Sequence, residues 1–571
     1  MSTVLTDNLP LLAGAPNGIK KLRELILELA VRGKLVPQDP SDEPASELLK
    51  RIAEEKARLV LEGKVKKQKT LAEFGEEAEP FELPAGWRWG TLAQVAFVNP
   101  RNAAADSLEV SFVPMTFIGT RFDDQHAQEP RVWGEVKQGF THFAEGDIGV
   151  AKITPCFENS KACVFSKLVN GLGAGTTELH IVRPVGGTLD PRFVLAYLKS
   201  PQFLLVGETK MTGTAGQKRL PKDFVETNPF PLPPLPEQHR IVAKVDELMA
   251  LCDRLEARQG DAESAHAQMV QALLNSLTHA RDAEDFAQSW QRLSEHFHTL
   301  FTTESSIDAL KKTLLQLAVM GKLVPQDPSD EPACKLLGRI STGKAELVRA
   351  GILKAPKPLP SIKQDEIPYT LPLTWQWVRL GEISQFINGD RGKNYPNRTE
   401  YVLEGIPWIN TGHIEPDGTL SQDSMHFITR DKFESLNSGK IRVGDLVYCL
   451  RGATFGKTAI VDPFSEGAIA SSLMIIRPFE PCSNRYMYRY LISQIGRDQI
   501  FRFDNGSAQP NLSANSVRLY VYPLPPLAEQ HRIVTKLDQL MALCDQLKAS
   551  LNQARQMHEH LASALIEQAV A

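Results

Sequence analysis

The sequence predicts an α+β fold in which two mixed α/β units are separated and bracketed by long antiparallel, coiled-coil-like helices. One observation is that GKLVPQDPSDEPA occurs twice, at 33–45 and at 321–333, an offset of 288. Another is a second repeated pair, PLPPLPEQHRIV from Pro231 and PLPPLAEQHRIV from Pro523, an offset of 292. Between each head and tail lie about 140 residues whose two versions share little beyond LPAGWRW and LPLTWQW at their entrances. The chain is therefore an internal duplication, for which we expect pseudo-twofold symmetry.

The two heads predict a helix, a fixed loop and a second helix. In KLRELILELAVRGKLV the apolar residues Leu22, Leu25 and Leu29 recur at helical spacing, and Gly33 is a natural helix end. The loop VPQDPSDEP has three prolines, and a second helix is expected to begin near Ala45. The repeated head predicts the same elements, with Gly321 ending its first helix.

The two tails predict long helices. Pro236 can occupy a first helical turn at little cost, because its missing N–H would be unpaired there. Apolar residues then alternate at steps of four and three, which is the pattern of a heptad seam. These residues are Ile241, Val245, Leu248, Cys252 and Leu255, and Ile533, Leu537, Leu540, Cys544, Leu547 and Leu551 in the repeat. Each helix is expected to exceed 35 residues and so to span roughly 50 to 60 Å.

Five regions follow from these signals. They are an N-terminal helical region and linker at 1–82, a first variable unit at 83–230, a central helical region and linker at 231–370, a second variable unit at 371–522 and a C-terminal helix at 523–571. Residues 281–305 have no repeat partner, and an extra helix joining the halves is expected there.

Composition excludes several classes of protein. A chain of 571 residues with 42% hydrophobic and 23% charged residues is ordinary for a globular protein. It has no apolar run of 18 residues and no signal-peptide pattern, so we expect no membrane partner and a cytoplasmic location. Seven cysteines without a CxxC pair argue against a zinc site and a disulfide framework. The net charge is −4, and residues 90–230 carry 14 Lys and Arg against 14 Asp and Glu, so any nucleic-acid affinity must come from local clustering.

The familiar catalytic patterns are missing. RGATFGKTA at 451–459 has three residues between its glycines where a nucleotide-binding loop has four, and it lies between strand-like segments. GLGAGTTEL at 171–179 lacks the GxGxxG spacing and is interpreted as a loop between strands. None of the 13 histidines forms a metal-ligating pair, and His239 and His531 are repeat equivalents assigned to helix entry. We therefore predict no catalytic residue and no metal ligand.

Polar and basic side chains gather instead in glycine-rich loops of both variable units. From Lys210 to Lys222 no acidic residue interrupts the basic ones. Arg, Lys, Asn, Gln and Ser side chains can donate to phosphates and read base edges, so these loops are the predicted DNA-binding sites. The candidate residues are Lys152, Thr154, Asn159, Lys161, Lys210, Thr212, Thr214, Gln217, Lys218 and Arg219 in the first unit, and Arg391, Lys393, Asn394, Arg451, Lys457, Asn505, Ser507, Gln509 and Asn511 in the second.

With these residues assembled, the chain resembles the specificity subunit of type I restriction-modification enzymes over nearly its whole length. The resemblance is carried by PLPPLPEQHRIV and PLPPLAEQHRIV at the exits of the variable units, by GDIGVAKITPCFENSKA and MTGTAGQKRLPKDF in the first unit, and by GDLVYCLRGATFGK and GSAQPNLS in the second. It implies that the variable units are target recognition domains, each reading one half of a bipartite, asymmetric DNA site, and that the repeated helices set the spacer and dock methyltransferase subunits.

The resemblance also implies the partners and their cofactors. The partners are double-stranded DNA, two methyltransferase (modification) subunits and separate restriction or motor subunits. S-adenosylmethionine, ATP and Mg are expected on those subunits, and no cofactor is expected on this chain. Two alternatives stay open at this point: a self-sufficient DNA methyltransferase or nuclease with an unrecognised site, and a coiled-coil scaffold that binds protein.

Overall fold

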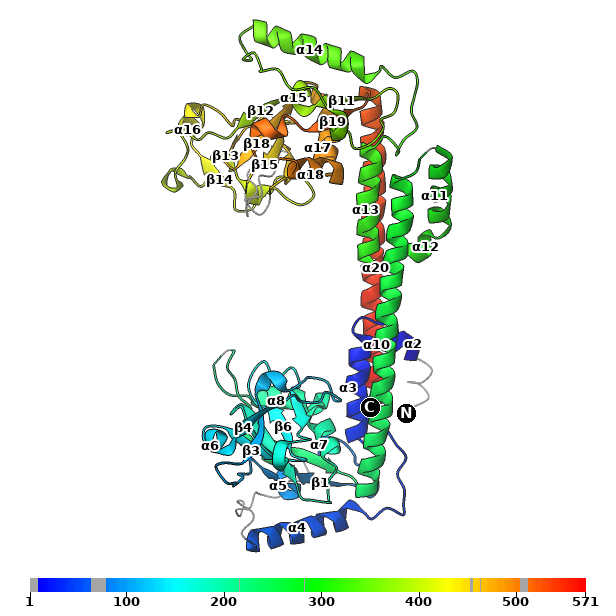
Figure 1. Ribbon diagram of the computed structural model, residues 1–571, viewed down its shortest axis with the longest axis vertical. Helices are drawn as coiled ribbons and strands as arrows, with labels where there is room; N and C mark the ends of the chain where they lie inside the picture. The colour runs from blue at the N-terminus through cyan, green and yellow to red at the C-terminus, as the bar shows by residue number, and fades with distance from the viewer. Residues whose placement is uncertain are drawn as a thin grey trace. The chain divides into compact units, whose positions relative to one another are not determined.

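The computed structural model describes residues 9–62, 79–214, 216–281, 283–451, 455–462, 464–503 and 512–570. They form two compact units, one comprising Met1–Glu263 with Gln553–Ala571 and the other Ser264–Asn552. Each unit combines a sheet domain with helices (Figure 1), so the predicted α+β class is confirmed.

The first unit contains two four-stranded sheets and a two-stranded one. The first sheet has the order β2-β9-β6-β7, made of Ala96–Val98, Leu179–Pro184, Ile148–Ala151 and Ala162–Val164, with every neighbour antiparallel. The second has the order β4-β3-β8-β5, made of Glu129–Val132, Glu109–Val113, Leu172–Gly175 and Thr141–Ala144, with β3 and β8 parallel. Strands β1 (Arg88–Thr91) and β10 (Pro229–Leu232) pair at the entrance and exit of the domain.

The second unit repeats this topology with little sequence in common, except that its described residues contain no counterpart of β5. Its first sheet has the order β12-β18-β15-β16, made of Ser384–Asn388, Leu473–Pro478, Leu446–Cys449 and Thr458–Ile460. Its second has the order β14-β13-β17, made of His426–Ile428, Ile406–Ile409 and Ala468–Ile469, again with a parallel pair, β13 with β17. Strands β11 (Gln376–Arg379) and β19 (Val521–Leu524) pair as β1 and β10 do. The duplication inferred from the heads and tails therefore extends through the variable units.

Short helices complete both sheet domains. In the first unit they are α5 (Leu92–Val95), α6 (Trp133–Val136), α7 (Pro191–Leu198), α8 (Pro201–Lys210) and α9 (Lys222–Thr227). In the second they are α15 (Leu380–Ile383), α16 (Arg430–Ser435), α17 (Asn484–Ile492), α18 (Gln494–Phe501) and α19 (Ala514–Val517).

The head helices form where the sequence predicts them. In the first unit α2 (Leu9–Gly14) precedes α3 (Gly18–Val31), and α4 (Ala45–Leu61) begins at the predicted residue. Gly33 has a φ of +66°, and an added Cβ would lie 2.4 Å from Cγ of Pro84, so the turn that ends this head needs glycine. In the second unit the counterparts are α13 (Glu304–Val319) and α14 (Ala333–Arg349), and Gly321 repeats the positive φ.

The tail helices α10 (Leu235–Thr278) and α20 (Leu527–Val570) each have 44 residues, which confirms the prediction of more than 35. In the second unit Lys548 contacts Asp308 at 3.1 Å while Asp545 contacts Lys311, so α13 and α20 run antiparallel. The unmatched segment forms α11 (Ala283–Glu295) and α12 (Phe297–Leu300), as expected for an extra helical insertion.

The repeated EQHR motif ties each sheet domain to its head loop. In the first unit the buried carboxylate of Glu237 accepts from Trp87 Nε1 at 3.0 Å and from Gln38 Nε2 at 3.2 Å. In the second, Glu529 accepts from Trp375 Nε1 at 2.9 Å and from Gln326 Nε2 at 2.6 Å. Burial raises the pKa of both glutamates. The repeated head and tail sequences are thus explained by one set of hydrogen bonds, in which the glutamate of the tail binds the tryptophan of the domain entrance and the glutamine of the head loop.

Replacing Glu237 or Glu529 by alanine is expected to lower the free energy of unfolding of its unit by about 2 kcal/mol. The substitution leaves a buried indole N–H without an acceptor, and such a group costs roughly 1 to 3 kcal/mol. Urea unfolding followed by tryptophan fluorescence measures the change. Glu237→Gln is the matched control, because its amide oxygen can still accept from Trp87 Nε1 while Gln38 Nε2 keeps its bond of 2.7 Å to the carbonyl of Gly33. Equal losses in the alanine and glutamine variants would contradict this explanation.

One interpretation from the sequence was wrong in part, since only residues 176–178 of the segment form a loop between strands. The glycine-rich segment 171–179 was expected to be a loop, but its residues Leu172–Gly175 form β8, between β3 and β5. The ring of Phe143 lies where a Cβ on Gly173 would be, at 2.1 Å from its Cε2 atom. Glycine is therefore used here for close packing inside a strand and not for a turn.

Candidate nucleic-acid interface

Predicted DNA-binding segments that the structure describes come together at one edge of the first sheet in each unit. In an antiparallel sheet the end of one strand lies beside the start of its neighbour. In the first unit the ends of β2 and β6 therefore share an edge with the starts of β9 and β7, next to residues 99–102, 152–161 and 176–178. In the second unit the matching edge carries residues 389–394, 450–451 and 471–472.

The first unit joins its two basic segments directly. Thr154 N donates to the carbonyl of Lys218 at 3.0 Å, and Lys218 N donates to Thr154 Oγ1 at 3.1 Å. Leu220 N donates to the carbonyl of Lys152 at 2.7 Å. A turn closes between Thr212 and Arg219, whose backbone groups exchange hydrogen bonds of 3.0 and 2.8 Å. Residues 64 positions apart in the chain thus form one surface.

A buried histidine that the sequence did not indicate fixes this surface to the sheet. His180, 4% exposed in β9, has Nε2 2.9 Å from the carbonyl of Leu220 and Nδ1 3.2 Å from Nδ2 of Asn99. Asn99 Oδ1 accepts from Ile181 N at 2.8 Å, so the Asn99 amide presents its NH₂ group to the imidazole. Burial lowers the pKa of His180 to about 4, which keeps the ring neutral.

This histidine makes the first unit sensitive to acid. Because its folded pKa lies below the ordinary 6.5, His180 stabilises the fold fully above pH 6.5 and loses that contribution as the pH falls toward 4. We expect about 2 kcal/mol of unfolding free energy to be lost between pH 7.5 and 5 from this group. Urea unfolding of the parent and of His180→Met at both pH values measures it, since Met474 occupies the matching position in β18. A parent and a variant with the same pH dependence would contradict the assignment.

The other predicted residues of the first unit divide into two sets. Arg219 pairs with Glu178 through two hydrogen bonds of 2.9 Å, and Lys161 Nζ donates to the carbonyl of Met115 at 3.0 Å. The rest of the set is mostly exposed around the same edge. These exposed residues are Asn159, Lys210, Thr212, Thr214, Gln217 and Lys218, with Lys152 and Thr154 half-buried.

The second unit builds its edge from different side chains. Arg391 Nη2 donates to the carbonyl of Ser471 at 3.4 Å, and Leu450 N donates to that of Ser472 at 3.0 Å, which places exposed Arg451 beside them. Asn394 Nδ2 is held at 2.6 Å by the carbonyl of Ser435. Lys393 is exposed, and Lys457 Nζ donates to the carbonyl of Ile414 at 3.4 Å, as Lys161 does to Met115. The predicted residues Asn505, Ser507, Gln509 and Asn511 lie outside the described residues.

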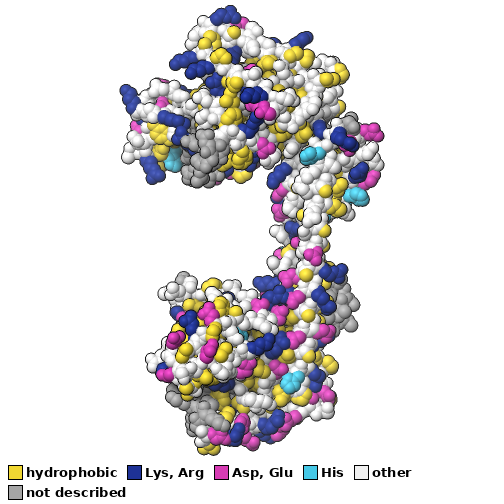
Figure 2. Space-filling view, viewed as in Figure 1, with side chains coloured by type: hydrophobic (Ala, Val, Ile, Leu, Met, Phe, Trp, Pro, Cys, Tyr) yellow, Lys and Arg dark blue, Asp and Glu magenta, His cyan; other side chains and the backbone are white. Residues whose placement is uncertain are grey.

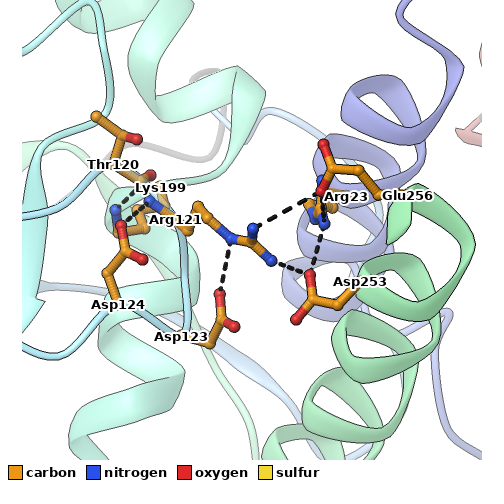
Figure 3. Close-up of polar contacts among 8 residues, drawn as sticks. All are labelled: Arg23, Thr120, Arg121, Asp123, Asp124, Lys199, Asp253 and Glu256. Atoms are coloured by element: carbon orange, nitrogen blue, oxygen red, sulfur yellow. Dashed lines mark hydrogen bonds and ion pairs between the residues drawn. The ribbon is translucent and has the colours of Figure 1, made fainter. Parts of the chain in front are cut away.

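A polar network joins the sheet domain of the first unit to helices α3 and α10 (Figure 3). Lys199, 3% exposed, donates to the carbonyls of Thr120 at 2.9 Å and Ser160 at 2.6 Å. Arg121, which follows Thr120 in the chain, contacts Asp253 of α10. Burial lowers the pKa of Lys199 to about 8.

The helices extend the same network. Asp253 also accepts from Arg23 of α3 at 2.5 Å, and Arg23 contacts Glu256 at 2.7 Å. A continuous set of contacts therefore runs from the helices to Ser160, between Asn159 and Lys161. The second unit has Ile492 at the position that matches Lys199, and no sequence pattern marked this lysine.

Charge and chemistry of the surface favour a local contact region over a broad one. Figure 2 shows Lys and Arg side chains scattered over the visible face of each unit, without one large basic surface.

In the described ranges, no three His, Cys, Asp or Glu side chains are grouped so that they could hold a metal ion. None of the helices in those ranges has both the length and the apolar character needed to cross a membrane.

Comparison with known proteins gives one consistent result. The model of the family "Type I restriction modification DNA specificity domain" matches residues 372–554. The chain is 47% identical over 564 residues to the type I restriction enzyme EcoAI specificity subunit of Escherichia coli, covering 97% of this chain and 94% of that protein. It is 46% identical over 570 residues to the EcoEI specificity subunit of the same species, with the same coverages.

The solved structures give a similar fold. One chain from a structure described as showing the basis of complex assembly and conformational transition of the type I R-M system aligns with a TM-score of 0.50 at 20% identity. The alignment covers 86% of this chain and 99% of that one.

Proposed function

Because this chain belongs to the family of type I restriction-modification specificity subunits, we propose that each of its sheet domains reads one half of a bipartite, asymmetric site in double-stranded DNA. The reading surface of each domain is the sheet edge at which the predicted basic and polar segments meet. Lys152, Lys210 and Lys218 contact phosphates there, while side chains fixed by the fold read base edges.

One observation carries this proposal: the two domains share a frame but differ at that edge. Leu179 pairs with Ala151 in the first unit as Leu473 pairs with Cys449 in the second. The residues just before these strands are Glu178 and Ser472. Two domains that recognise different half-sites require this combination of the same strand arrangement and different side chains at the DNA-binding edge.

The chain supplies recognition, and the chemistry belongs to other subunits. Two methyltransferase subunits dock on the repeated helices and bind S-adenosylmethionine, and restriction or motor subunits use ATP and Mg. The 44-residue helices α10 and α20 fix the separation of the half-sites. This division is supported by the missing catalytic motifs of the sequence and by membership of the family.

The test combines a methylation assay with sequencing of methylated positions. The purified chain is incubated with genomic DNA and S-adenosylmethionine, alone and together with the methyltransferase subunits. We expect methylated adenines in one bipartite, asymmetric motif only in the presence of those subunits. Duplex binding by the complex should weaken with salt, and the variant Lys210→Ala/Lys218→Ala should reduce the salt slope by roughly one to two.

Two results would replace this proposal by the alternatives. Methylation or cleavage by the chain alone would identify a self-sufficient enzyme. A complex that shifts no duplex even at low salt, where phosphate contacts are strongest, would identify a protein-binding scaffold.

A further inference from the structure

One arginine of the first sheet edge is held in a geometry that suits base recognition. Nε of Arg219 donates to Oε2 of Glu178 and Nη2 donates to Oε1, both at 2.9 Å. The carboxylate thus binds the side of the guanidinium that carries Nε. A guanidinium has five N–H groups in a fixed fork. The opposite end, formed by Nη1 and the second hydrogen of Nη2, still carries a pair of parallel donors.

That second fork is available to a ligand. Within the part of the chain that the structure describes, Nη1 of Arg219 donates to no protein acceptor. The side chain of Arg219 is 48% exposed, whereas that of Glu178 is 24% exposed. The carboxylate is therefore the more buried member of the pair, and the guanidinium is the member that a ligand can reach more easily.

The backbone beneath this pair is fixed to the sheet. Arg219 pairs as an isolated antiparallel bridge with Ile153 and with Thr212. The next residue, Leu220, is hydrogen-bonded through its N–H to Lys152 and through its carbonyl to His180. Glu178 directly precedes β9. Both members of the pair are thus positioned by sheet residues, which limits the orientations that the guanidinium can take.

Charge distinguishes Arg219 from its neighbours. The hydrogen bond from Arg219 is the main cause that lowers the pKa of Glu178, so the carboxylate is ionised and offsets the charge of the guanidinium. A neutralised arginine is a poor contact for a phosphate, and an anion beside it repels one. Guanine presents two acceptors, O6 and N7, in the major groove, and their commonest specific partner is a bidentate arginine.

We propose that Arg219, oriented by Glu178, reads a guanine in the half-site recognised by the first sheet domain. This inference rests on the proposed function and adds the base and the residue that reads it. Ser472 occupies the position in the second domain that matches Glu178, so an arginine oriented by a glutamate in this way is expected in one half-site only. Glu178 is here a positioning residue, and Lys218 and Lys210 remain phosphate contacts.

The test uses the full chain expressed with its methyltransferase subunits, and sequencing of methylated adenines gives the recognised motif. Arg219→Lys keeps the positive charge and removes the fork, and Lys218→Ala is the matched control from the adjacent position. We expect Arg219→Lys to relax the motif at a single G·C pair of one half-site, with discrimination there falling roughly 5- to 150-fold. Glu178→Gln should relax the same position to a smaller extent. Lys218→Ala should lower methylation at all sites alike and leave the motif unchanged.

The outcomes separate this inference from the function on which it rests. A parent complex that yields no bipartite motif removes the proposed function. A bipartite motif that stays strict at every position in Arg219→Lys, or that relaxes equally in Lys218→Ala, overturns the role of Arg219 alone. If Arg219→Lys abolishes methylation, binding of that complex to duplexes with each base at every half-site position decides: equal weakening for all bases overturns the inference, and loss of preference at one guanine supports it.

Discussion

Replacing Asp445 by alanine is expected to lower the free energy of unfolding of the second sheet domain by about 3 to 5 kcal/mol. The side chain of Asp445 is 2% exposed and lies just before β15. Its two oxygens accept from Nε and Nη2 of Arg477, in β18, both at 2.7 Å. Oδ2 also accepts from Arg442 N at 2.8 Å. Without the carboxylate, Nε of Arg477 and the backbone N–H of Arg442 lose their acceptor, and Nη2 of the largely buried guanidinium keeps only the carbonyl of Lys440, at 3.2 Å.

Hydrogen exchange gives the most direct measurement, because it reports the opening of β15 and β18 separately from the rest of the chain. Peptides covering 446–449 and 473–478 should exchange much faster in Asp445→Ala than in the parent. The double variant Asp445→Leu/Arg477→Met is the control, since replacing both members of a buried ion pair by apolar residues is often close to neutral. A single variant with less than about 1 kcal/mol of destabilisation would show that the pair is not a structural requirement.

The first sheet domain has the same pair, Asp147 with Arg183, at 2.8 and 2.7 Å. Burial raises the pKa of Asp147, against the opposing effect of Arg183. A comparison of the two variable units could have found it. In both units the dipeptide GD precedes one strand, and another strand has the sequence LHIVRP or LMIIRP. Antiparallel pairing of β6 with β9, and of β15 with β18, brings the aspartate of the first pattern next to the arginine of the second. The weak sequence similarity between the two variable units thus reflects the buried Asp–Arg ion pair that both contain.

The helical parts of the fold were predictable because their signals are local. Glycine ends, proline starts and apolar periodicity each act within a few residues, and they placed the head helices, the beginning of α4 and the length of α10 and α20. The insertion at α11 and α12 followed from the absence of a repeat partner. Local signals were misleading in part at 171–179, where close packing in β8 explains Gly173 and Gly175, while Gly171, with a φ of +69°, is a turn residue before the strand.

The arrangement of the candidate interface was less predictable because it depends on contacts between distant residues. The segments themselves were predicted from their basic and polar side chains. That Thr154 bonds Lys218, and that His180 and Lys199 support the surface from below, follows only from the sheet order. A single buried histidine or lysine in an apolar strand or helix carries no pattern in one sequence. Its role becomes visible when the carbonyl groups that it binds have been placed.

The largest functional effect is expected from lengthening the tail helices. Inserting one heptad after Gly260 in α10 and another after Asn552 in α20, 292 residues later, adds about 10 Å to each helix. This length is close to the rise of three base pairs of B-DNA, which also turn the duplex by roughly 100°. A heptad turns an α-helix to within about 20° of its starting direction. We therefore expect a complex that recognises half-sites separated by about three more base pairs, or that no longer methylates DNA, as measured by sequencing methylated positions.

The control separates helix length from chain length. Fourteen glycine and serine residues inserted into the polar linker that follows α4 add the same number of residues as the two heptads without extending a helix, and the recognised motif should not change. A heptad in α10 alone should impair assembly with the methyltransferase subunits, because only one of the two repeated helices on which they dock is then lengthened. Unchanged methylation sites in the variant with both insertions would exclude a spacing role for the helices. In that case the partner subunits would have to set the distance between the half-sites, because lengthening α10 and α20 would not have altered the spacing at which the two sheet domains bind DNA.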